Sequence, residues 1–113
     1  MFLTNISFSV RRLEKTSGKE AYAAAHLTDQ AGFIEPSLDL SEFLGVPSGE
    51  AFSLTVEGAP DIQIGDLLTD SEGREFRVKL EKKHRGAEFS GGALPDLAEF
   101  ALVLSRQQQN AQF

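Results

Sequence analysis

The residues that could perform acid–base, thiol or metal chemistry are few in this 113-residue chain. It contains no cysteine, which excludes a disulfide, a Cys-ligated zinc site and any thiol chemistry. Neither of its two histidines, His26 and His84, belongs to the His-x-x-x-His spacing that places two metal ligands on one helix face. We therefore expect no metal site, and we interpret His84 as a solvated residue at the end of a strand.

Carboxylates and glycines supply no catalytic or phosphate-binding motif either. Asp61, Asp66 and Asp70 lack the spacing, the glycine and the closing glutamate of an EF-hand loop, and we interpret them as turn formers. Ser90-Gly91-Gly92 is not followed by the lysine of a phosphate-binding loop, and no Gly-x-Ser-x-Gly motif is present. The sequence thus predicts a non-enzymatic protein with no catalytic residue and no cofactor.

The formal net charge of −6 is segregated along the chain. Residues 1–19 hold four basic residues and one acidic residue, residues 20–73 hold eleven acidic residues and no Lys or Arg, and residues 74–113 hold seven basic and five acidic residues. One interpretation is a solvated acidic surface beside a few basic strands. The alternative is a subunit with one acidic and one basic face that meets its copies head to tail, because such contacts can close into rings.

Much of the positive charge lies in one short run, which consists of Arg74, Arg77, Lys79, Lys82, Lys83 and Arg85. Nucleic-acid readers normally carry a basic excess, and single-strand binders offer several stacking aromatics. This chain is acidic, and only Phe89 lies near the run. Alternation would also place Glu75 and Glu81 on the outward face of the run. We predict a complementary charge face for an acidic protein surface rather than a sequence-specific DNA site.

The elements that must position these residues are mainly strands, because the hydrophobic pattern has a period of two. It runs over residues 6–10, 52–56 and 76–80, and the last segment places Phe76, Val78 and Leu80 in one apolar row. Residues 100–104 are apolar on both faces and predict a central strand. A short strand is expected at 62–64, continuing to 67–68. Gly, Pro and Asp favour turns at 16–19, 58–61 and 69–73.

Residues 20–35 are compatible with a helix or a strand. Alanines at 21–25 favour a helix, but the alternation around Tyr22 and His26 favours a long bent strand. We prefer the strand, broken at Asp29-Gln30 and ended by Pro36, because the residue before a proline is driven to extended geometry. The best helix spans 38–44, with Ser37 or Asp39 as its N-cap and Gly45 as its terminator.

The sequence therefore predicts an all-β fold, a small antiparallel β-barrel or sandwich with two long loops and at most one short helix. We expect a single domain over 1–105 and a mobile C-terminal tail at 106–113. The loops are 36–50 and 85–96, and loops of this length are often functional.

The two loops and the tail carry six apolar residues, Phe43, Leu44, Val46, Phe89, Leu94 and Phe113. Those of the loops either fold back as plugs on the ends of the barrel or serve as anchors that are buried only in an assembly, and Phe113 could be such an anchor too. Aromatic and other apolar residues supply most of the binding energy at such interfaces. The assembly interpretation makes these six residues the predicted interface.

One stretch has a familiar layout. Residues 61–78 combine Ile-x-x-Gly-Asp-x-Leu, a hairpin Asp-x-Glu-Gly-Arg-Glu and Phe-x-Val, and residues 31–36 read x-Gly-x-x-Glu-Pro. With the closing strand at 100–104, this order resembles small head-closure or head–tail joining proteins of long-tailed bacteriophages. The alanines at 21–25 depart from that pattern, since similar proteins have β-branched or aromatic residues there.

The resemblance implies a structural protein of the virion neck that is assembled in the host cytoplasm. Its partners would be copies of itself in a ring of six or twelve, the portal or adaptor protein above and the tail or tail-terminator protein below. The ring would help to retain packaged DNA, which passes without sequence-specific binding, and the acidic block could line that channel. No membrane contact is expected, because no apolar run approaches the roughly 20 residues of a span.

Two alternatives stay open at this point. A tail-terminator or tail-tube subunit would share the β fold and the ring assembly. A free SH3-like or OB-like barrel would instead bind a peptide or an oligonucleotide through one face.

Overall fold

The computed structural model describes residues 3–16, 18–84 and 96–105. Within these ranges eight strands and one helix follow one another. Their bounds are β1 Ile6–Arg11, β2 Leu13–Thr16, β3 Lys19–Tyr22, β4 Leu27–Pro36, α1 Leu38–Leu44, β5 Ala51–Glu57, β6 Leu67–Asp70, β7 Glu75–His84 and β8 Leu97–Leu104. The predicted all-β class with one short helix is confirmed.

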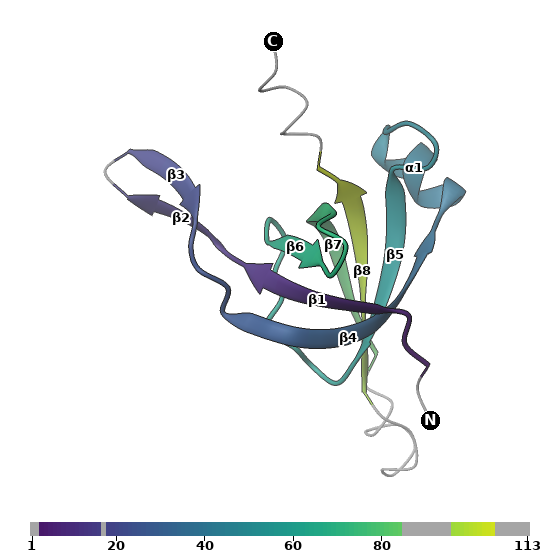
Figure 1. Cartoon of the computed structure of the whole chain (residues 1–113). Coiled ribbons are helices and arrows are strands. Elements are labelled where there is room, and N and C mark those ends of the chain that lie inside the picture. Colours follow the sequence, from purple (N-terminus) through teal and green to yellow (C-terminus); the bar gives the residue numbers. More distant parts are fainter. Residues whose placement is uncertain (1–2, 17, 85–95, 106–113) are drawn as a thin grey trace.

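Six of the strands close into an antiparallel barrel in the order β1-β4-β5-β8-β7-β6 (Figure 1). The pairing of β6 with β1, where Phe8 lies opposite Asp70, completes the circle. A closed barrel has no open strand edge that could pair with another chain. β8 lies between β5 and β7, so the central strand predicted at 100–104 is confirmed.

The inward-facing residues of the barrel form one hydrophobic core. Its largest fully buried apolar side chains are Phe76, Phe100, Leu54, Ile62, Leu68 and Leu102. Phe52 packs edge-on against Phe76 with 5.3 Å between the ring centroids, which is the geometry that aromatic pairs prefer. The apolar rows predicted at 6–10, 52–56 and 100–104 all contribute to this core.

A β-bulge in β7 moves Leu80 out of its predicted apolar row. Val78 and Leu80 pair with adjacent residues of β8, so Lys79 is an extra residue in the ladder. One extra residue exchanges the two faces of a strand from that point on. Leu80 is consequently 39% exposed, whereas Val78 is fully buried. The prediction that Leu80 continues the buried row is therefore wrong.

Residues 19–36 form β3 and β4, so the strand interpretation is confirmed and the helix alternative is wrong. The break lies at 23–26 rather than at Asp29-Gln30, and the His26 amide still donates to the Val10 carbonyl at 3.0 Å. Asp29 instead distorts β4 from within. It has a φ of 54°, and the register between β1 and β4 shifts there.

Gly32 allows β4 and β5 to approach closely. A Cβ atom at this position would lie 2.9 Å from the Thr55 carbonyl oxygen and 2.9 Å from Leu54 Cδ1. The carbonyl belongs to the paired backbone of β5, so it cannot retreat without disturbing the ladder. Only glycine fits at this position without a shift of the sheet.

The segment 58–66 between β5 and β6 is a turn, contrary to the strand predicted at 62–64. The Asp66 carboxylate accepts a hydrogen bond from the Gln63 amide at 2.8 Å, and Gly65 has a φ of 97°. This local side-chain bond competes with strand pairing. Ile62 is buried in the core all the same, while Ile64 is exposed.

The helix α1 lies between β4 and β5, as predicted. Ser37 Oγ accepts a hydrogen bond from the Leu40 amide at 3.2 Å, which decides the N-cap in favour of Ser37. Gly45 ends the helix with a φ of 71°, and the Val46 amide donates to the Ser41 carbonyl at 3.0 Å. The helix is thus fixed at both ends by its own sequence.

Strands β2 and β3 form a separate hairpin that projects from the barrel (Figure 1). In the described residues each strand pairs only with the other, with Leu13 opposite Tyr22 and Thr16 opposite Lys19. The turn predicted at 16–19 is the tip of this hairpin. Isolated two-stranded hairpins are marginally stable in water, so its base needs further contacts with the barrel.

Candidate assembly surface

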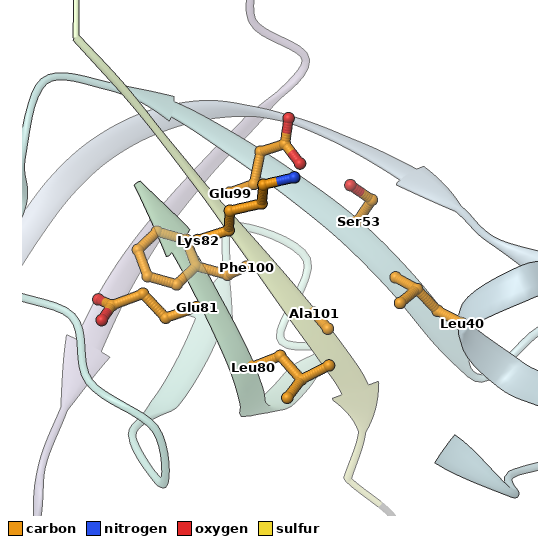
Figure 2. A pocket seen from close by; sticks show the side chains of 8 residues that line it. All are labelled: Leu40, Ser53, Leu80, Glu81, Lys82, Glu99, Phe100 and Ala101. Carbon is orange, nitrogen blue, oxygen red and sulfur yellow. The ribbon is translucent and has the colours of Figure 1, made fainter. Parts of the chain in front are cut away.

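An apolar groove crosses the outer face of β5, β8 and β7, with α1 along one side (Figure 2). Its volume is about 360 Å³. The residues that line it are Leu40, Ser53, Leu80, Glu81, Lys82, Glu99, Phe100 and Ala101. Leu80 faces this outer side because of the bulge at Lys79, where it lies opposite Ala101. The bulge therefore creates the apolar floor of the groove.

The side of α1 that points away from the barrel is both apolar and acidic. Its exposed residues are Leu38, Asp39, Glu42 and Phe43, and Phe43 is 74% exposed. Neither Asp39 nor Glu42 has an ion-pair partner among the described residues. Of the predicted anchors in this loop, Leu44 and Val46 are half-buried against the chain itself. Phe43 alone is fully presented to solvent.

The outer face of β7 carries basic side chains beside the groove. Lys79 and Lys82 are exposed there, whereas Lys83, also exposed, pairs with the buried Ala98 and belongs to the opposite face of the strand. None of the three has an ion-pair partner in the described part of the chain. Lys82 lies opposite Glu99 in the sheet, and Glu99 Oε1 lies 3.2 Å from His84 Nε2. Glu99 therefore lies beside two basic groups.

The bulge also changes where Glu81 lies. The alternating pattern predicted it on the face of Arg77 and Lys79, but it pairs with Phe100 on the opposite face of β7. Glu81 is exposed and still contributes to the lining of the groove. This prediction is wrong for the same reason as that for Leu80, since one extra residue exchanges the two faces.

Two residues of the predicted charge face are engaged within the chain. Arg74 Nε lies 2.7 Å from Asp70 Oδ2 and 3.6 Å from Glu72 Oε2. The guanidinium of Arg77 lies 6.0 Å from the ring centroid of Tyr22. In this run Arg77, Lys79, Lys82 and Lys83 have no carboxylate partner among the described residues, and of these only Arg77 packs on an aromatic ring.

The base of the β2–β3 hairpin is held by an ion-pair cluster around Arg12. Its Nε and Nη2 atoms lie 3.1 and 3.0 Å from the two carboxylate oxygens of Asp66, and Nη2 lies 3.2 Å from Asp61 Oδ1. The side chain of Asp66 is only 3% exposed. Bidentate contacts of this kind are among the stronger ones in proteins. The cluster connects the hairpin to the 58–66 turn.

The same contacts shift the pKa values of the exposed members of the cluster. The hydrogen bonds from Arg12 lower the pKa of Asp61 below its usual value. The hydrogen bonds from Arg12 to Asp66, which have the larger effect, and to Asp61 raise the pKa of Arg12. His26 Nε2 lies 2.9 Å from the Asp61 carbonyl oxygen, and the Tyr22 hydroxyl donates to the Gly65 carbonyl at 3.4 Å. The turn thus contacts both the start and the end of the hairpin.

The interpretation of the three aspartates as turn formers holds for Asp66 and Asp70. The Asp70 carboxylate accepts the amides of Glu72 and Arg74 at 3.0 and 2.8 Å, which shapes the hairpin between β6 and β7. Both carboxylates additionally pair with an arginine, which the sequence did not predict. Five of the acidic residues in 20–73 form ion pairs with Lys or Arg, namely Glu20, Asp61, Asp66, Asp70 and Glu72, so the free negative charge is smaller than the linear count.

Four predicted interface or charge-face residues lie outside the described residues, together with the tail at 106–113. They are Arg85, Phe89, Leu94 and Phe113. Pattern analysis missed the contribution of Leu80 and Leu38 to the exposed apolar surface. The only available signal for Leu38 was its place next to the N-cap of a short helix, a position often open to solvent.

The chain matches no family model, no curated protein and no solved structure. Among the described residues no helix has the length and apolar character needed to cross a bilayer. In the same part of the chain no three His, Asp or Glu residues are grouped so that they could hold a metal ion.

Proposed function

We propose that the chain is a structural subunit of a bacteriophage neck, a ring-forming head-closure or head–tail connector protein that links the portal or adaptor to the tail. The proposal rests first on the order of motifs over residues 31–36, 61–78 and 100–104. In the barrel these segments belong to β4, to the turn and hairpin from Asp61 to Val78, and to β8. The barrel is thus compatible with the architecture that the resemblance implies.

The observation that carries the assembly role is the set of surfaces that a closed barrel leaves available for contacts with other chains. The six barrel strands pair with one another all round, so strand addition to the barrel cannot supply affinity. What remains is an apolar groove, an acidic and apolar helix, a row of free lysines and a projecting hairpin. Surfaces of this kind suit a subunit whose role is to contact neighbours.

The alternative of a free barrel that binds oligonucleotides has less support. Such barrels present open aromatic rings on which bases stack. Among the described residues the ring of Tyr22, on the hairpin strand β3, lies beside the basic run, and it is already contacted by the guanidinium groups of Arg11 and Arg77 at 5.9 and 6.0 Å from its centroid. We therefore keep the neck subunit as the proposed function.

The test is a long-tailed phage that encodes this chain and in which its gene is interrupted. We expect DNA-filled heads that lose their DNA and complete tails that stay unattached, both visible by electron microscopy. Tails of uncontrolled length would instead indicate the tail-terminator alternative. Joined, infectious particles would contradict every role in the neck.

A further inference from the structure

We infer that the groove over β5, β8 and β7 is the docking site for α1 of a second copy of this chain. The inference names the contact between neighbours in the proposed ring, and to that extent it rests on the proposed function. It starts from two surfaces that are incomplete in the single chain. One is the groove itself, and the other is the exposed side of α1.

The apolar parts of the two surfaces match in kind and size. The groove presents Leu40, Leu80 and Ala101 within about 360 Å³, and an apolar cavity of about 150 Å³ is enough for benzene. The side chain of Phe43, which is 74% exposed, offers an aromatic ring for such a space. Aromatic residues that enter apolar pockets are the usual energetic centres of protein interfaces.

The charged parts match as well, and they decide in favour of a second copy. α1 carries Asp39 and Glu42 without ion-pair partners among the described residues. Lys82 lines the groove together with the carboxylates Glu81 and Glu99, and Lys79 directly precedes the groove residue Leu80. Neither lysine has an ion-pair partner in the described part of the chain. Glu99 Oε1 at the groove lies 3.2 Å from His84 Nε2. An α1 helix from another copy brings two carboxylates to two free ammonium groups.

The bulge in β7 is the structural feature that makes this surface. Without the extra residue Lys79, alternation would turn Leu80 into the core, and Lys82 would leave the outer face. A bulge costs ladder hydrogen bonds and is commonly retained where it redirects a side chain. Here it places an apolar residue and a lysine on the same outer strip.

The experiment uses sedimentation velocity of the full chain from micromolar to millimolar concentration. A helix-reversed variant carries Asp39→Lys with Glu42→Lys, and a strand-reversed variant carries Lys79→Glu with Lys82→Glu. Each alone brings like charges together, so we expect association to weaken at least about tenfold. An equimolar mixture of the two variants restores opposite charges at every contact, and we expect it to recover wild-type association.

Two further variants separate docking from a general effect of charge or folding. Phe43→Ser keeps the charges and removes an exposed ring, so we expect weakened association that mixing does not restore and an unchanged thermal midpoint. The control, Lys15→Glu with Glu20→Lys, exchanges an exposed pair at 3.9 Å on the hairpin and should leave association unchanged.

The inference is overturned if the wild-type chain stays monomeric throughout, or if association is unchanged in both reversed variants. Association that depends only on residues 106–113, tested by their deletion, overturns it too. These outcomes leave the neck role open to its own test in the phage. Conversely, self-association that follows the charge pattern in a chain dispensable for head–tail joining would support the docking contact and contradict the proposed function.

Discussion

The guanidinium of Arg12 contacts both carboxylate oxygens of Asp66, at 3.1 and 3.0 Å, although the two residues lie 54 positions apart. Asp66 is almost fully buried and also accepts the Gln63 amide, so one carboxylate shapes the 58–66 turn and anchors the projecting hairpin. Loss of either partner should therefore affect both segments.

Arg12→Ala should destabilise the fold by about 3 kcal/mol, the low end of the range for breaking a buried ion pair, because the arginine itself is partly exposed. It leaves the buried carboxylate of Asp66 without its counter-charge. Urea denaturation followed by circular dichroism measures the free energy of unfolding. Lys15→Ala is the matched control, since its exposed pair with Glu20 should contribute less than about 1 kcal/mol. Equal losses in the two variants would argue against this role of Arg12.

Gly32→Ala should cost about 1–3 kcal/mol, the usual range for overpacking. The added methyl group would meet the Thr55 carbonyl oxygen at 2.9 Å, and a paired backbone atom has little room to move. The thermal midpoint reports the loss. Ala31→Ser, one residue away on the exposed side of β4, should stay within about 0.5 kcal/mol of the wild type. A neutral Gly32→Ala variant would mean that β4 and β5 can separate without cost.

Asp70→Ala should destabilise the β6–β7 hairpin by about 2 kcal/mol, since two backbone amides and the Arg74 guanidinium lose their acceptor. Asp70→Asn keeps one side-chain oxygen for the amides and loses the charge pair, so we expect an intermediate loss. Hydrogen exchange of the Glu72 and Arg74 amides separates the two contributions. Both amides should stay protected in the Asn variant and exchange faster in the Ala variant.

Acid should remove the contribution that ionised Asp61 makes to the stability of the fold. The folded protein lowers the pKa of Asp61 through its hydrogen bonds with Arg12, so its stabilisation is complete above the unfolded pKa of about 3.9. It disappears as the pH falls through the lower, folded pKa. Asp61→Asn should thus melt below the wild type at pH 6, and the difference between the two midpoints should be smaller at pH 2. A constant difference at both pH values would contradict this assignment.

Much of the fold follows from short-range sequence signals. The alternation at 6–10 and 52–56, the doubly apolar segment at 100–104 and the turn residues at 69–73 predicted an all-β barrel or sandwich, and these segments form barrel strands or their turns. The helix at 38–44 was predicted with its bounds, with Ser37 or Asp39 as N-cap and Gly45 as terminator, because such residues act on backbone groups within a few positions. These local patterns predict the strands, turns and helix correctly even when the partner strands are unknown.

The prediction of a strand at 62–64 was wrong because a side-chain interaction that the apolar spacing does not reveal favours a turn there. The apolar spacing of Ile62 and Ile64 fits a strand, but Asp66 binds the Gln63 amide, and its own charge is compensated by Arg12 from a distant part of the chain. The period-two hydrophobic pattern cannot predict a turn that depends on an arginine remote in the sequence.

The sequence by itself determined the class of fold, the bounds of helix α1, the absence of cysteine chemistry and the separation of acidic from basic segments. Only the tertiary structure decided which of those charges remain free. It paired Asp61 and Asp66 with Arg12 and left Asp39, Glu42, Lys79 and Lys82 unpaired among the described residues. The physical reason is that a register shift of one residue, as at Lys79, depends on pairing with β8 and changes the face of every residue after it.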